Sequence, residues 1–178
     1  MRPRPPSSFL GFALGALLLA AAGCHPFPKD PESSLEKARR RGALRVGVSE
    51  APPWVIRDGD EARGVEPALV RSFADSLGLA VEWRWGSVEE HAAALEELGL
   101  DVVAAGMTEG NPWTRKIGAT RPYYEERAVR GAGGRRGARR HVLAVPPGEN
   151  ALLVRLERHL EARRSDVEPY LRRRERAP

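Results

Sequence analysis

The side chains that could do acid–base or metal chemistry are few and scattered along this chain. Its four histidines, His25, His91, His141 and His159, do not stand at metal-ligand spacing. Glu90 and His91 are adjacent, but the surrounding pattern places them on a capped surface helix. The sequence contains no Gly-x-Ser-x-Gly or His-Glu-x-x-His motif. We therefore predict that the chain is not an enzyme and that it holds no metal or other cofactor.

The only cysteine, Cys24, follows a segment with the pattern of an export signal. Arg2 and Arg4 are basic, residues 9–22 are almost wholly apolar, and small residues lead up to Cys24. The apolar run is short for a permanent membrane span. With one cysteine, no intramolecular disulfide can form. We expect residues 1–23 to be removed.

The junction Ala21-Ala22-Gly23-Cys24 resembles the lipobox of bacterial lipoproteins, with Ala21 where leucine is most common. This resemblance implies cleavage after Gly23 and fatty acylation, such as palmitate, on Cys24. An ordinary signal peptide followed by an unmodified cysteine is the alternative. In the lipoprotein interpretation, residues 24–34, which are rich in proline, form a lipidated tether.

Charge divides the exported part of the chain into two segments. Residues 24–126 carry 13 basic and 18 acidic side chains, whereas residues 127–178 carry 14 and 6. We predict that the basic segment does not bind nucleic acid, because we expect the chain to be exported and this segment has one aromatic residue, Tyr170. A solvated helical face is the first interpretation of its arginines, and contact with anionic lipid is the second.

The apolar pattern after the tether alternates between helix and strand. We predict helices over 35–41, from about 66 to 77, and after the Ser87/Glu90 capping box, together with strands over 43–48, 81–85 and 101–105. An Asp58-Gly59 turn indicates a hairpin between the first strand and the second helix. This order predicts an α/β fold with a small, mainly parallel sheet flanked by helices. Ligands of such sheets bind at the carboxyl ends of the strands, here the loop over 49–54 and the turn over 106–108.

An ordered set of short motifs resembles the first lobe of family 3 extracellular solute-binding proteins, the amino-acid receptors of ABC importers. These motifs are Leu44-Arg45-Val46-Gly47-Val48, Pro52-Pro53-Trp54, Gly64-Val65-Glu66, the run from Leu100 to Thr108, Arg115 and Thr120-Arg121-Pro122-Tyr123-Tyr124. The resemblance implies that Trp54 stacks on a small polar solute. It also implies that Gly106 and Thr108 bind the α-ammonium and α-carboxylate, and that Arg115 grips the carboxylate.

Each of these residues also has a structural interpretation. Trp54 could cap the core beneath the hairpin, and Gly106 with Thr108 could form only a turn. Arg115 lies two residues beyond the spacing typical of the family, so a solvated surface position is its alternative. Glu66 has a structural role by default, since a carboxylate is favourable near a helix N-terminus.

The family resemblance stops after residue 124, where a second lobe would follow. We predict lobe one over 35–126, a Gly/Arg-rich loop over 127–140 in place of lobe two, and a returning strand and basic C-terminal helix over 141–178. The helix carries apolar residues at helical spacing, namely Leu152, Leu153, Leu156 and Leu160. The expected fold is thus a single-lobed periplasmic-binding-protein-like domain whose second lobe is missing or replaced.

Two functions follow from these patterns. The first is a membrane-anchored lipoprotein of the bacterial envelope, facing the periplasm or cell exterior, that binds an amino-acid-like solute weakly and works with an ABC permease. The second is an envelope scaffold that retains the lobe for contact with other envelope proteins and has lost solute binding.

Overall fold

A five-stranded sheet forms the centre of the protein in the computed structural model, which describes residues 30–130 and 136–175. The strand order is β4 (Ala80–Trp85), β1 (Ala43–Val48), β5 (Val102–Ala104), β9 (Ala144–Val145) and β6 (Gly118–Ala119). β1 runs parallel to both β4 and β5, whereas β9 is antiparallel to β5 and β6. The predicted α/β fold with a mainly parallel sheet is confirmed.

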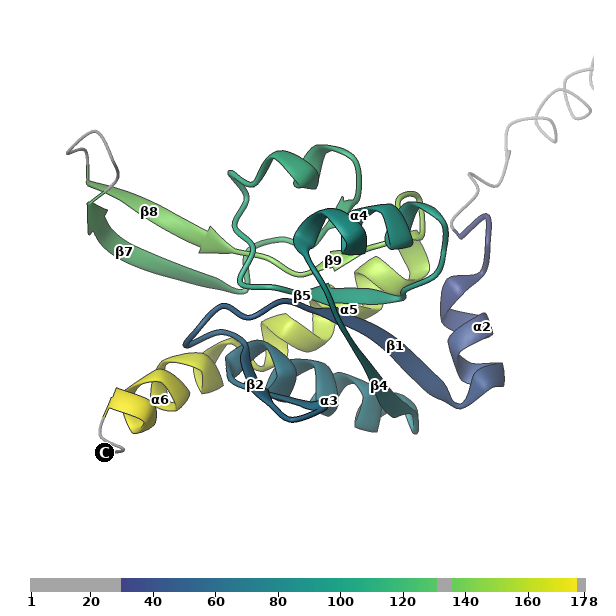
Figure 1. Ribbon diagram of the computed structural model, residues 1–178, viewed down its shortest axis with the longest axis horizontal. Helices are drawn as coiled ribbons and strands as arrows, with labels where there is room; N and C mark the ends of the chain where they lie inside the picture. The colour runs from purple at the N-terminus through teal and green to yellow at the C-terminus, as the bar shows by residue number, and fades with distance from the viewer. Residues whose placement is uncertain (1–29, 131–135, 176–178) are drawn as a thin grey trace, which may run out of the picture.

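Helices cover both faces of this sheet (Figure 1). Alternate β1 residues, including Leu44 and Val46, pack with Phe73 of α3 (Val65–Leu77) and Leu156 of α5 (Asn150–Ala162) in one buried cluster. On the opposite face, α4 (Val88–Glu96) packs against β5 in a second cluster. β5 is buried on both faces, as its continuous apolar sequence predicts.

Local signals set the helix ends where the sequence predicts them. Gly42 ends α2 (Ser34–Arg41) with a φ of 75°, and Gly78 ends α3 with a φ of 69°. Ser87 and Glu90 form the predicted capping box at the start of α4. The Asp58-Gly59 hairpin is also present, between β2 (Ile56–Asp58) and β3 (Glu61–Arg63).

The N-terminal segment joins the fold earlier than predicted. The carboxylate of Glu149 accepts hydrogen bonds from the backbone amides of Glu32, at 2.9 Å, and Ser34, at 2.8 Å. Residues that we assigned to the tether are therefore fixed against the start of α5. Cys24 and the predicted signal peptide over 1–23 lie outside the described residues.

The predicted loop over 127–140 was wrong for residues 127–130 and 136–140, which form strands, whereas residues 131–135 lie outside the described residues. The structure has an antiparallel arm made of β7 (Tyr124–Arg130) and β8 (Arg136–His141), which projects from the lobe (Figure 1). Residues 137–140 of β8 are all exposed, so β8 lacks the alternation of apolar and polar residues from which a strand is predicted. Opposite charges face each other across the arm, for example Glu126 and Arg139.

The C-terminal segment also differs in detail from the expected strand and helix. His141 ends β8, and two residues separate it from β9, so the expected returning strand belongs to two different sheets. The expected helix is divided at Arg163 into α5 and α6 (Arg164–Glu175). Leu152, Leu156 and Leu160 are buried as the helical pattern predicts. Among the described residues, no helix is long and apolar enough to cross a membrane.

Candidate functional site

The loop after β1 and the turn after β5 meet at the carboxyl ends of these two parallel strands, as the strand order requires. We call this place, around Gly106 and Thr108, the Gly106 edge. Gly106 has a φ of 62°, and a Cβ atom added to it would lie 2.7 Å from the Cβ of Ala51 and 3.6 Å from Cδ1 of Trp54. Only glycine fits this close approach without displacing the neighbouring loop. The structure therefore brings Gly106 and Trp54, two of the predicted site residues, into direct proximity.

A substitution at Gly106 tests how tightly this edge is packed. We expect Gly106→Ala to lower the free energy of unfolding by about 1–3 kcal/mol, because of the positive φ and the clash with Ala51. Gly110→Ala is the matched control, since a Cβ at Gly110 meets no atom within 4 Å. Chemical denaturation of both variants measures the difference; equal stabilities would contradict the packing described here.

Glu66 holds the Gly106 turn from the first turn of α3. Its fully buried carboxylate accepts hydrogen bonds from the Gly106 amide, at 2.9 Å, and the Tyr123 hydroxyl, at 2.7 Å. Burial raises the pKa of Glu66 to about 7, and hydrogen bonds from Gly106 and Tyr123 oppose that shift. Glu66 is thus a positioning residue for the turn, which fits the structural role expected for it.

Thr108 lies in an isolated antiparallel bridge with His141. The pairing bonds come from its neighbours, Met107 O with Val142 N at 3.0 Å and Glu109 N with Arg140 O at 2.9 Å. The Thr108 carbonyl accepts the Asn111 amide at 2.9 Å. Within the described chain, the Thr108 amide and hydroxyl and the Gly106 carbonyl have no hydrogen-bond partner. Two donors and one acceptor therefore remain available at this edge.

Trp54 lies in the core, with an exposed fraction of 7%, as its structural interpretation expects. Its indole stacks on the imidazole of His141, with ring centroids 3.7 Å apart and an interplanar angle of 29°. Tyr124 packs nearby at 5.5 Å. The indole face against His141 is therefore not available to a solute in this conformation.

His141 is a site residue that the sequence did not reveal. It is fully buried at the end of β8, its Nδ1 has no hydrogen-bond partner in the described structure, and its Nε2 lies 3.5 Å from Oε2 of Glu126. Burial lowers the pKa of His141, against the opposing effect of Glu126. Its role depends on the pairing of β7 with β8, which places Tyr124 opposite it. The sequence contained no signal for that pairing.

Arg115 is not part of this cluster. It lies in a short 3₁₀-helix, η2 (Pro112–Arg115), which begins where Asn111 Oδ1 accepts the Trp113 amide at 3.0 Å. The Arg115 side chain is exposed, and no hydrogen bond or ion pair joins it to another described residue. The extra loop residues thus form a turn of their own, and Arg115 has the surface position of its alternative interpretation.

A groove of about 620 Å³ lies beside Trp54. One wall is the loop at Pro52 and Pro53, and the other is α6, through Glu168 and Arg172. Tyr124 also lines the groove, and its hydroxyl donates to Glu168 at 2.9 Å. The sequence did not predict that α6 would approach this edge. Among the described residues, no group of three histidine, cysteine or acidic side chains is placed to hold a metal ion.

The parallel sheet, the edge at Gly106 and Thr108 and the paired β7 and β8 define one lobe of a periplasmic-type binding protein. The model of the bacterial extracellular solute-binding proteins, family 3, matches residues 44–168. The chain belongs to this family, and the predicted resemblance is confirmed.

Solved structures support the single-lobe fold. The arginine-bound form of domain 1 from TmArgBP is 25% identical, with a TM-score of 0.59, and the match covers 71% of this chain and 97% of that one. An ancestral cationic amino acid solute-binding protein, AncCDT-1, shares the fold at 16% identity and a TM-score of 0.64, over 78% of this chain and 99% of that one.

Curated relatives include membrane-bound lytic murein transglycosylases. The membrane-bound lytic murein transglycosylase F of Vibrio cholerae is 33% identical over 112 residues, which are 62% of this chain and 21% of the relative. That of Photobacterium profundum is 30% identical over 114 residues, 64% of this chain and 22% of the relative. The chain spans about a fifth of the length of these relatives, within their binding-like domain. The description of the family as extracellular indicates an envelope location.

Proposed function

We propose that this chain binds a small amino-acid-like solute at the edge formed by Gly106 and Thr108. The observation that carries the proposal is the set of unpaired groups there, the Gly106 carbonyl and the Thr108 amide and hydroxyl. A carboxylate would accept from both Thr108 donors, and an ammonium group would donate to the Gly106 carbonyl. These are the charged groups of a free α-amino acid.

Rigid neighbours favour this use of the edge. Glu66 fixes the Gly106 amide, and the bridge to His141 fixes Thr108, so little backbone ordering is needed on binding. The side chain of Trp54 would form a wall of the binding site. Its indole would be free to stack on a solute after His141 moves away. The arginine-bound domain 1 of TmArgBP supports binding by one lobe. Because an open edge leaves the polar contacts in competition with water, we expect a dissociation constant of about 1 mM.

Thermal shift against a panel of amino acids tests this function. We expect at least one amino acid to raise the melting temperature of the wild-type chain, and Thr108→Ala to abolish that rise. Arg115→Ala reports whether this exposed guanidinium also reaches the carboxylate, with Arg84→Ala as the matched control on the outer face of β4. No shift with any amino acid at concentrations of about 10 mM would contradict solute binding.

The proposed setting is the cell envelope, with the chain held at a membrane by acyl chains on Cys24 and facing the periplasm or cell exterior. An ABC permease is the proposed partner, and the lobe itself is proposed to have no catalytic activity. The family membership supports a binding role, and the name of the curated relatives supports membrane association.

A scaffold function is the second candidate, favoured by the stacking of His141 on Trp54. Because His141 covers the face of Trp54 that would stack on a solute, the lobe would be better suited to protein contacts than to solute binding. The murein transglycosylase relatives suggest a partner in murein turnover. Co-purification of an envelope protein with both the wild type and Thr108→Ala, without any amino-acid shift, would favour this candidate.

A further inference from the structure

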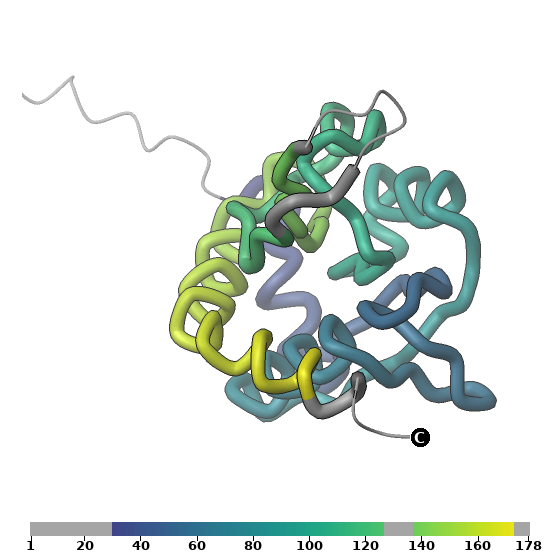
Figure 2. The backbone as a smooth tube through the Cα atoms, turned by 90° about the vertical axis from the view of Figure 1, so that its left-hand side faces the viewer, coloured from purple at the N-terminus to yellow at the C-terminus, as the bar shows by residue number. Residues whose placement is uncertain are grey.

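A shallow groove on the surface is lined by three arginines from two helices. Arg39 of α2 and Arg155 and Arg158 of α5 line this groove of about 490 Å³. Its remaining lining residues are Leu35, Asn150, Ala151 and Val154. Figure 2 shows α2, in purple, beside α5, in yellow-green. We call these residues the α2–α5 face.

The positive charge of this face is poorly neutralised. Arg155 and Arg158 are exposed, and neither forms an ion pair with another described residue. Arg39 pairs with Glu36, but both side chains are about half exposed, so the interaction free energy of this ion pair is small. Guanidinium groups held without carboxylates are suited to phosphate, which they bind through two parallel hydrogen bonds.

An apolar side chain lies among these cations. Val154 is 42% exposed and is the one large hydrophobic residue with an exposed side chain in the part of the chain that the structure describes. A combination of basic residues with an exposed apolar one is typical of surfaces that rest on anionic lipid headgroups. Nucleic acid and acidic protein partners would explain the arginines but give no reason for the exposed valine.

The chain enters the fold at the same two helices. Glu149, directly before α5, binds the backbone amides of Glu32 and Ser34 at the start of α2. Asp30 is the sixth residue after Cys24, so the segment between their Cα atoms spans at most about 20 Å. A lipid on Cys24, which is part of the proposed function, would therefore hold Asp30 within that distance of the membrane, and with it the adjoining starts of α2 and α5.

We propose that the α2–α5 face docks on the anionic phospholipid surface to which the chain is anchored. Arg39, Arg155 and Arg158 bind headgroup phosphates, and Val154 enters the interface between headgroups and acyl chains. Docking by this face orients the lobe with respect to the membrane. It also gives the anchored chain a second membrane attachment besides the acyl chains.

Vesicle co-sedimentation tests this proposal without any contribution from acylation. The protein used begins at His25, which removes Cys24 and keeps every residue of the two buried clusters. We expect it to bind vesicles of equal parts phosphatidylglycerol and phosphatidylethanolamine, but not phosphatidylcholine vesicles. Binding is expected to weaken with added salt.

Matched variants locate the surface. We expect Arg155→Ala/Arg158→Ala to lower vesicle affinity about tenfold or more. Arg63→Ala/Arg84→Ala, which removes the same charge from exposed positions on β3 and β4, is expected to lower it less than twofold. Val154→Ser should weaken binding without changing its salt dependence. Equal losses in the two double variants, or no preference for anionic vesicles, would overturn the proposal.

Two further measurements distinguish binding to the membrane from binding to other anions. Inorganic phosphate, compared with sodium chloride at the same ionic strength, is expected not to displace the protein; specific displacement would indicate a free-phosphate site and overturn docking on lipid. Tighter sedimentation with purified murein than with anionic vesicles would do the same. Mass spectrometry of Cys24 in the full chain made in bacteria tests the anchor separately, so that absent vesicle binding with an acylated Cys24 would reject only this inference.

Discussion

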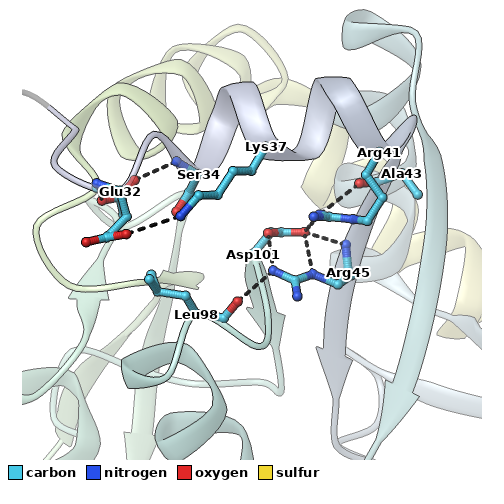
Figure 3. Close-up of polar contacts among 9 residues, drawn as sticks. Glu32, Ser34, Lys37, Arg41, Ala43, Arg45, Leu98 and Asp101 are labelled. Atoms are coloured by element: carbon cyan, nitrogen blue, oxygen red, sulfur yellow. Dashed lines mark hydrogen bonds and ion pairs between the residues drawn. The ribbon is translucent and has the colours of Figure 1, made fainter.

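Replacing Asp101 with alanine is expected to lower the free energy of unfolding by about 3–5 kcal/mol. Asp101 is 1% exposed, and it precedes β5, the strand that leads to the Gly106 turn. Its carboxylate accepts the Arg45 backbone amide at 2.7 Å and pairs with Arg41 at 2.5 Å and with Arg45 Nη2 at 3.0 Å (Figure 3). Alanine would remove the carboxylate that two partly buried guanidinium groups share and would leave each of them only one backbone carbonyl as acceptor.

Urea denaturation of Asp101→Ala measures this loss. Asp75→Ala is the matched control, because Asp75 is exposed on α3 and forms no ion pair within the described residues. The control is expected to change stability by less than about 0.5 kcal/mol. A similarly small effect of Asp101→Ala would show that Arg41 and Arg45 do not depend on this carboxylate.

Glu66→Ala is expected to lower the free energy of unfolding by about 3 kcal/mol and to abolish solute binding. The substitution leaves the Gly106 amide and the buried Tyr123 hydroxyl without their acceptor, at about 1–3 kcal/mol for each group. It also releases the turn that presents the Gly106 carbonyl and Thr108. Denaturation and calorimetric titration with the solute found in the thermal-shift panel measure the two effects.

Glu66→Gln separates the charge from the hydrogen bonds. Its amide oxygen can accept the Gly106 amide while its NH₂ group donates to Tyr123, so most of the stability should remain. A glutamine that destabilised as much as alanine would mean that the turn requires the ionised carboxylate.

The raised pKa of Glu66 predicts a pH dependence of stability. The folded protein holds the Glu66 proton up to a pKa of about 7, whereas the ordinary pKa of a glutamate, expected in the unfolded chain, is 4.5. Protonated Glu66 therefore contributes fully to the free energy of unfolding below pH 4.5, and this contribution is lost as the pH rises through about 7. Subtracting the profile of Glu66→Gln isolates this contribution. If the two profiles run parallel between these pH values, Glu66 has an ordinary pKa.

The residues of the first lobe were predictable because their local signals agree with their packing. Gly42, Gly78 and the Ser87/Glu90 pair set the helix ends, and the apolar residues of β1 and β5 lie in the core. The strand order then placed Gly106 beside the loop at Trp54 without any further information. Sequence patterns worked here because each of these features depends on residues close together in the chain or on burial alone.

The rest of the site depends on contacts between distant segments. The pairing of β7 with β8 positions His141 against Trp54, yet both strands of the arm are too polar to show a strand pattern. Glu149 binds backbone amides more than one hundred residues earlier in the chain. The position of α6 against Tyr124 depends on the Glu168 hydrogen bond. The spacing of residues in a single sequence does not predict contacts between segments so far apart in the chain.

We propose above that one lobe binds an amino-acid-like solute at Gly106 and Thr108. Amide chemical shifts of the isotopically labelled chain, recorded during titration with the solute from the thermal-shift panel, test it most directly. We expect saturable shifts at the amides of Gly106, Met107 and Thr108 and at the Trp54 indole, all fitting one dissociation constant. A folded protein in which these signals stay constant, or in which only residues of the groove beside α6 respond, would contradict the claim.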